Sequence, residues 1–150
     1  MDLWRWYVYE NENSPETWNT YWWQLNYEFL GISPPTGYTT EGLDATGKYH
    51  VMENIPYIRY FLASFLQLQF FEALCEDYEN IHDCQLRGNK KAGARLWRMM
   101  EKGSSEHWSV VLKEMTGFSE ILSKPLLRYF EPVRSWLEAE VRKNNLTVGW

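Results

Sequence analysis

The sequence lacks the marks of several large protein classes. Its 150 residues carry a net charge of -5 and no dense cluster of lysine and arginine. Because such clusters supply most of the affinity for phosphates, we do not expect nucleic acid as a partner. The longest apolar run, residues 55–74, is interrupted by Arg59, Gln67, Gln69 and Glu72, whereas a membrane span needs about 20 mostly uncharged residues. We therefore expect no transmembrane segment in this chain.

Other common signals are also missing. The opening "MDLWRWYVYE" has neither a basic region nor a run of aliphatic residues, so we expect no signal peptide in it. The chain shows no internal repeat, low-complexity tract or interdomain linker. What it has in excess is aromatic residues, with nine Trp, ten Tyr and seven Phe. A large aromatic side chain buries about 150–250 Å². Burying all of these side chains needs more interior volume than a short chain usually has, so we interpret residues 1–150 as part of a larger body.

The hydrophobic pattern predicts an all-α chain. Apolar residues recur at three- and four-residue spacing from Pro15 to a stop at Gly31, with Asn13 or Ser14 as the cap. A long loop follows, with a short extended piece around residues 49–51. Further helices are expected from Pro56 to about residue 77, over 89–102 before Gly103, from a cap at Ser104 or Ser105 to about 116, and from about Ser123 to Asn144, kinked or split at Pro132.

Two cysteines, Cys75 and Cys84, flank a short polar segment. A disulfide between them would close a loop of about ten residues and stabilise the fold by roughly 2.5 kcal/mol. The alternatives are free buried thiols in a cytosolic protein, or a zinc site with His82, for which the spacing is unusual and a fourth ligand is lacking. The glycosylation sequon at Asn145 points, like a disulfide, to an oxidising compartment.

The stretch "KYHVMENIPYIRYF" places polar groups at the start of the most apolar helix. Lys48 and His50 alternate in the expected extended piece, and Tyr57 and Tyr60 share a face if the helix begins at Pro56. Arg59 points about 100° away from Tyr60 and, if buried, needs an anion. These groups would offer cations and hydrogen-bond donors to a carboxylate and a carbonyl, without a nucleophile or base. The alternative is that these polar groups make their hydrogen bonds to other residues inside a hydrophobic core and bind no ligand.

Several blocks of the sequence resemble one family in order. They are "DLWRW", "WWQL", "KYHV", "PYIRYF", "QFFEALC", "KAGARL" and "PLLRYFEPVRSWL". They resemble the C-terminal part of peptidase family M2, the angiotensin-converting enzyme family, from Asp2 to Trp150. The resemblance implies a largely helical zinc metallopeptidase that removes C-terminal dipeptides in a cleft between two lobes. Residues 1–150 would be the C-terminal portion of the catalytic domain and one half of that cleft.

The resemblance also implies roles for the polar stretch. His50 is similar to the family histidine that hydrogen-bonds a substrate carbonyl near the scissile bond. Lys48 and Tyr57 resemble groups that hold the substrate's C-terminal carboxylate. Tyr60 matches the tyrosine that donates to the oxyanion of the tetrahedral intermediate, a kind of contact worth on the order of 3 kcal/mol in the transition state.

Chloride sites and a disulfide follow from the same resemblance. Arg59 matches a family arginine that binds an activating chloride, and Cys75 and Cys84 match a family disulfide. Trp22 lies where a second chloride site is found, but Asn26 stands in the place of that site's usual arginine. Ser64 stands where an aromatic residue often lines the pocket for the last substrate side chain, so selectivity there is expected to differ.

The metal-binding half of the family's machinery is missing from these residues. The motif H-E-x-x-H, which with a downstream glutamate supplies the zinc ligands and the general base, does not occur in the 150 residues. We therefore expect this isolated chain to be inactive. The zinc ligands would lie outside it, in the remainder of an extracellular enzyme that is secreted or anchored to a membrane. The alternative function is a catalytically inactive, M2-like module that binds peptides with a free C-terminal carboxylate.

Overall fold

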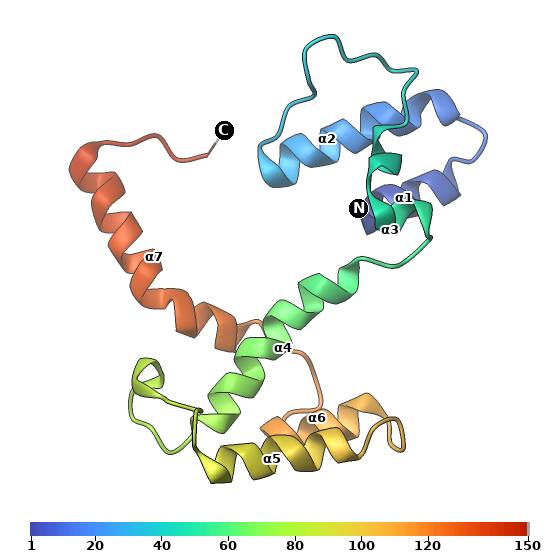
Figure 1. The fold of residues 1–150 in the computed structure, drawn as a ribbon. Helices are drawn as coiled ribbons and strands as arrows, with labels where there is room; N and C mark the ends of the chain where they lie inside the picture. The colour runs from blue at the N-terminus through green and yellow to red at the C-terminus, as the bar shows by residue number, and fades with distance from the viewer. Residues whose placement is uncertain (150) are drawn as a thin grey trace. The chain divides into compact units, whose positions relative to one another are not determined.

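A computed structural model describes residues 1–149, and in this range every regular element is a helix. The expected all-α class is therefore confirmed. The chain divides into two compact units, one formed by Met1–Tyr60 with the chain end from Thr147 on, the other by Phe61–Leu146. In chain order the elements are α1 (Asp2–Glu10), η1 (Pro15–Thr17), α2 (Trp18–Leu30), η2 (Asp44–Gly47), α3 (Tyr49–Met52), α4 (Ile58–Leu74), η3 (Ile81–Asp83), α5 (Lys90–Glu101), α6 (Trp108–Thr116) and α7 (Lys124–Asn144) (Figure 1).

The first unit is built on an aromatic core between α1 and α2. Trp4 and Trp22 meet edge to face with ring centroids 5.9 Å apart, and Leu25 and Ala45 complete the buried cluster. The indole N–H of Trp4 donates to the Trp18 carbonyl at 2.8 Å, so this buried ring keeps its polar atom satisfied. The two helices and the short turns η2 and α3 thus pack as one body.

The limits of α2 follow local chemistry. Pro15 opens η1, where its missing N–H costs nothing, and α2 continues directly from it. The helix ends at Gly31, which has φ 65 and so occupies the left-handed region that glycine tolerates best. Ser14 precedes η1 without a side-chain capping bond, so the expected cap is wrong in this detail.

The extended piece expected around residues 49–51 is wrong. Tyr49–Met52 forms the short helix α3, in which the amides of Val51 and Met52 both donate to the Lys48 carbonyl. Residues 1–149 contain no strand with which an extended segment here could pair. Helical turns satisfy the backbone groups locally instead.

The helix α4 begins two residues later than expected. Pro56 and Tyr57 precede it, and the Tyr57 amide donates to the Asp2 carboxylate. At its other end α4 stops at Leu74, just before Cys75, rather than near residue 77. The helix crosses the boundary between the two units at Tyr60.

In the second unit, α5 and α6 lie side by side as a helical hairpin (Figure 1). Asn89 caps α5 by accepting from the Ala92 amide, and the chain turns at Gly103, which has φ 51. The cap of α6 is His107, whose ring nitrogen accepts from the Ser109 amide. The expected caps at Ser104 or Ser105 are therefore wrong, since the helix starts later.

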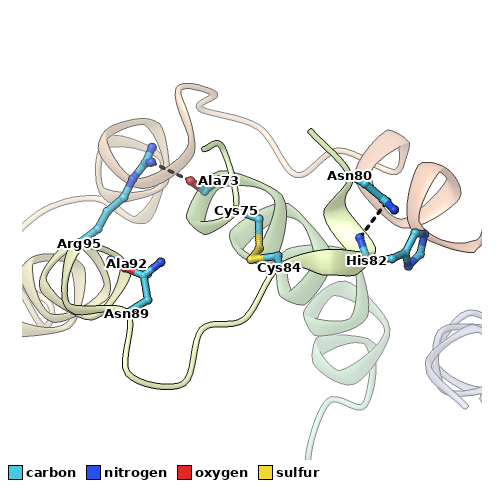
Figure 2. Close-up of a disulfide and its surroundings, with 8 residues drawn as sticks. All are labelled: Ala73, Cys75, Asn80, His82, Cys84, Asn89, Ala92 and Arg95. Carbon is cyan, nitrogen blue, oxygen red and sulfur yellow. Dashed lines mark hydrogen bonds between the residues drawn. A yellow bond between two sulfur atoms is a disulfide. The ribbon is translucent and has the colours of Figure 1, made fainter. Parts of the chain in front are cut away.

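The disulfide between Cys75 and Cys84 is present, with Cα atoms 5.7 Å apart. It closes the segment that holds η3, where the Asn80 side chain accepts from the His82 amide (Figure 2). His82 packs its ring against Tyr129 with centroids 4.9 Å apart. The alternatives of free thiols and of a zinc site with His82 are therefore excluded for these cysteines.

The last helix, α7, remains unbroken through Pro132. Of the two outcomes expected at Pro132, a kink or a split, the split does not occur, and the helix bends along its length (Figure 1). Its apolar side chains are largely exposed, among them Leu127, Phe130, Val133, Trp136 and Leu137. None of the helices in residues 1–149 combines the length and hydropathy that crossing a bilayer requires.

Candidate functional site

Three aromatic side chains form a polar cluster at the edge of the first unit. The ring of His50 lies edge-on to those of Tyr57 and Tyr60, with centroids 4.8 and 5.6 Å away, and the two tyrosine rings are 4.9 Å apart. The Nε2 atom of His50 is 3.4 Å from the Tyr60 hydroxyl. Tyr57 and Tyr60 are 39% and 53% exposed.

Lys48 lies at the N-cap position of α3, two residues before His50 in the sequence. Its side chain is exposed, and within residues 1–149 the ammonium takes part in no hydrogen bond or ion pair. Three of the residues predicted to grip a substrate, Lys48, His50 and Tyr57, thus come from the short stretch around α3. Tyr60 joins them from the first turn of α4.

A buried ion pair on α1 binds the backbone of two residues of this cluster, His50 and Tyr57. The Asp2 carboxylate accepts the Tyr57 amide at both oxygens, at 3.1 and 2.9 Å. The Arg5 guanidinium pairs with Asp2 and donates to the carbonyls of His50 at 2.8 Å and Ile55 at 3.0 Å. Both side chains are about nine-tenths buried. A buried charge is stable only with such partners, so the pair and the turn depend on each other.

A second polar anchor holds the loop that leads to Lys48. Asn19 on α2 is 1% exposed and exchanges two hydrogen bonds with Asp44, accepting from its amide at 2.9 Å and donating to its carboxylate at 3.1 Å. The Trp23 indole donates to the same carboxylate at 2.7 Å. This anchor fixes η2, whose end is followed directly by Lys48.

The sequence analysis predicts neither anchor. Asp2 and Arg5 enter it only as part of the block "DLWRW". The available signal was two opposite charges three residues apart in an otherwise aromatic helix, since charges on a buried face require partners. Asn19 offered a similar signal, because it lies among the tryptophans of α2.

The two predicted chloride residues lie in different environments. Arg59 is exposed at the start of α4, and within the described part of the chain it has no hydrogen bond or ion pair. The condition of burial, under which Arg59 would need an anion, is therefore not met in this chain. Trp22 lies in the core, and the Asn26 amide donates to its carbonyl at 2.8 Å. Asn26 is neutral, so it brings no charge for an anion.

The donors of this chain do not fit a zinc ion. Across residues 1–149, no group of three or more His, Cys, Asp or Glu side chains is arranged to hold a metal. Catalytic zinc needs three protein ligands and an open position for water. The cluster of His50, Tyr57 and Tyr60 therefore offers hydrogen-bond donors and acceptors to a ligand, and it does not provide a metal centre.

Comparisons with known proteins identify the family of the chain. The family model described as angiotensin-converting enzyme, of the M2 peptidases, matches residues 1–150. The chain is 40% identical to the angiotensin-converting enzyme of Bos taurus, 39% to the angiotensin-converting enzyme-like protein Ace3 of Mus musculus and 36% to the angiotensin-converting enzyme-related protein of Drosophila melanogaster. All of the chain is matched, but it covers only 12%, 21% and 25% of those proteins. The chain belongs to peptidase family M2.

Proposed function

We propose that this chain is the substrate-gripping part of a zinc peptidyl-dipeptidase, an enzyme that removes dipeptides from peptide C-termini. The observation that carries the proposal is the cluster of His50, Tyr57 and Tyr60, exposed at one edge and next to Lys48 in the chain. Membership of the M2 family supports it. The cluster supplies hydrogen-bond donors and Lys48 supplies a cation, and a free C-terminal carboxylate is an anion that both can bind.

Each side chain has a role in the proposal. Lys48 and the Tyr57 hydroxyl bind the terminal carboxylate of the peptide. His50 donates to a backbone carbonyl near the scissile bond, and Tyr60 donates to the oxygen that becomes negative in the transition state. Since a donor aimed at the developing charge stabilises the transition state more than the substrate, Tyr60 raises kcat more than it lowers KM.

The remaining chemistry is proposed to come from the rest of the catalytic domain. When bound there, zinc would activate the attacking water. The residues described here do not hold the metal, and this chain contains no H-E-x-x-H motif. Arg59 and Trp22 stay candidate chloride ligands, to be tested by the chloride dependence of the longer enzyme.

The disulfide and the sequon lead us to place the protein outside the cell, as a secreted or membrane-anchored ectodomain. The bridge of Cys75 and Cys84 needs an oxidising compartment. Asn145 follows α7, and it and its neighbour Leu146 are exposed, as a glycosylation site requires. Treatment of the secreted protein with a glycosidase should lower its apparent mass, and replacement of Asn145 by glutamine should abolish that shift.

The function is tested with the chain and with a longer form that contains it. Purified residues 1–150 should release no C-terminal dipeptide in the presence of zinc. A longer form that includes an H-E-x-x-H segment should release it and lose activity with a chelator. In that form, Tyr60→Phe should lower kcat by about 100-fold or more, whereas Tyr78→Phe in the second unit should leave it unchanged. Chelator-sensitive turnover by the 150 residues alone, or an unimpaired Tyr60→Phe enzyme, would contradict the proposal.

The alternative is an inactive M2-like module that binds peptides. The same cluster of His50, Tyr57 and Tyr60 would serve it, because binding a peptide carboxylate requires no metal. It predicts that a longer natural form lacks the zinc motif, yet still binds a peptide carboxylate more tightly than the matching amide. Sequencing the transcript upstream of the codon for Met1 separates the two functions directly.

A further inference from the structure

The polar cluster has little core of its own to hold it. His50 and Tyr57 lie on short turns rather than on long helices, and Tyr57 and Tyr60 are exposed. Short turns with exposed side chains are among the less stable parts of a protein. The geometry of the cluster must therefore be set by neighbouring segments.

The contacts that set it are polar and come from α1. The Asp2 carboxylate binds the Tyr57 amide, which fixes the backbone that carries the Tyr57 ring. The Arg5 guanidinium binds the carbonyl of His50 and the carbonyl of Ile55, and so fixes the two ends of the turn between α3 and Pro56. One ion pair thus holds the backbone on either side of the turn.

The planar guanidinium is suited to this task. Its donors are arranged in a rigid fork, and the same nitrogen atom, Nη2, reaches both carbonyls while Nη1 faces Asp2. A lysine at position 5 would keep the charge but offer only a point-like ammonium. The carbonyls of His50 and Ile55 would then share one donor group without fixed directions.

We propose that Asp2 and Arg5 are positioning residues for the substrate-binding cluster. They touch no substrate; they act through the backbone of His50 and Tyr57. This inference deepens the proposed function and rests on it for the meaning of the cluster. The contact itself can be tested without any peptidase activity.

The test is amide hydrogen exchange of the full 150-residue chain by NMR. In the unchanged protein, the Tyr57 amide should exchange at least 100-fold more slowly than in an unstructured peptide, since it donates to a buried carboxylate. In Arg5→Lys, its exchange should become about tenfold faster, whereas the Leu25 amide in the middle of α2 should change less than threefold. Asp2→Asn should have the same selective effect. The matched control is Arg95→Lys.

Arg95 makes the same kinds of contact in the second unit. It donates to the Ala73 carbonyl at 2.7 Å and pairs with Glu76 at 2.8 Å. Its replacement should leave the Tyr57 exchange rate unchanged. If Arg5→Lys accelerates Tyr57 and Leu25 equally, the pair only stabilises the unit and the proposal is wrong. Rapid exchange of the Tyr57 amide in the unchanged chain would also overturn the proposal. This measurement does not depend on whether the two variants fold.

A peptide titration separates this proposal from the proposed function. An N-acetylated dipeptide with a free carboxylate, and its C-terminal amide, are added to the labelled unchanged chain. The carboxylate form should shift the signals of His50, Tyr57 and Tyr60 more than the amide does. If neither form causes a shift while the selective exchange effect is present, the peptide-binding function fails and the positioning role stands.

Discussion

A single buried glutamine should contribute strongly to the second unit. Gln69 on α4 is 3% exposed, and its side-chain nitrogen donates to the Glu120 carbonyl at 3.1 Å and to the Thr116 hydroxyl at 3.4 Å. Its oxygen accepts from the Leu122 amide at 3.1 Å. Gln69 therefore holds the connection between α6 and α7 against α4.

The cost of Gln69→Ala can be worked from these bonds. Truncation leaves the Glu120 carbonyl and the Leu122 amide without this partner, and an unsatisfied buried group costs about 1–3 kcal/mol. Gln69 also lines an open pocket, through which water can reach the freed groups and reduce the cost. The two groups together would cost about 2–6 kcal/mol, and because water can reach them we expect the low end of this range, about 2–3 kcal/mol.

The assay is urea unfolding followed by circular dichroism, combined with hydrogen exchange at Leu122. With a urea dependence of about 2 kcal/mol per molar, the midpoint should fall by roughly 1 M. Exchange at the Leu122 amide should accelerate more than exchange in α5. Gln67→Ala is the matched control, because Gln67 lies on the same helix but is exposed. If the unfolding free energies of Gln69→Ala and Gln67→Ala differ by less than about 0.5 kcal/mol, the reasoning is refuted.

Three further predictions concern the same unit. Replacement of Cys75 and Cys84 by serine should lower stability by about 2.5 kcal/mol, measured by unfolding against the unchanged chain with its bridge intact; equal midpoints would contradict this. Arg95 donates to Glu76 and lowers the pKa of its carboxyl below 4.5. That contribution is present above pH 4.5 and is lost as the pH falls through the lowered pKa, so Glu76→Gln should flatten the acid side of the stability profile. Gly117 ends α6 with φ 85 and has open space around it, so Gly117→Ala should cost about 1 kcal/mol from backbone strain alone, and a neutral result would contradict it.

The helices could be predicted because their signals are local. The spacing of apolar residues in α2, the proline before it and Gly31 after it all act within a few turns of chain. The bridge of Cys75 and Cys84 is similar, since the two cysteines are separated by only nine positions. For the predicted helices, the errors lie at the ends, such as the start of α6, where His107 is the cap instead of the expected serines.

The region around Lys48 to Tyr57 was predicted less well, because its conformation depends on distant partners. The local sequence predicts an extended piece at residues 49–51 and a helix start at Pro56. In the structure, the Tyr57 amide is bound by Asp2, 55 positions away in the sequence. No window of the local sequence contains that contact.

By itself, the sequence determined the helical class, most helix positions, the disulfide and the polar residue types of the candidate site. Those properties depend on neighbours along the chain and on side-chain chemistry. Only the tertiary structure decided that the rings of His50, Tyr57 and Tyr60 meet, that Arg59 is exposed and that Arg5 is the buried arginine. A buried charge is stable only where the fold brings carboxylates or carbonyls within hydrogen-bond distance of it. For Arg5 these include the carbonyls of His50 and Ile55, which lie 45 and 50 positions away in the sequence.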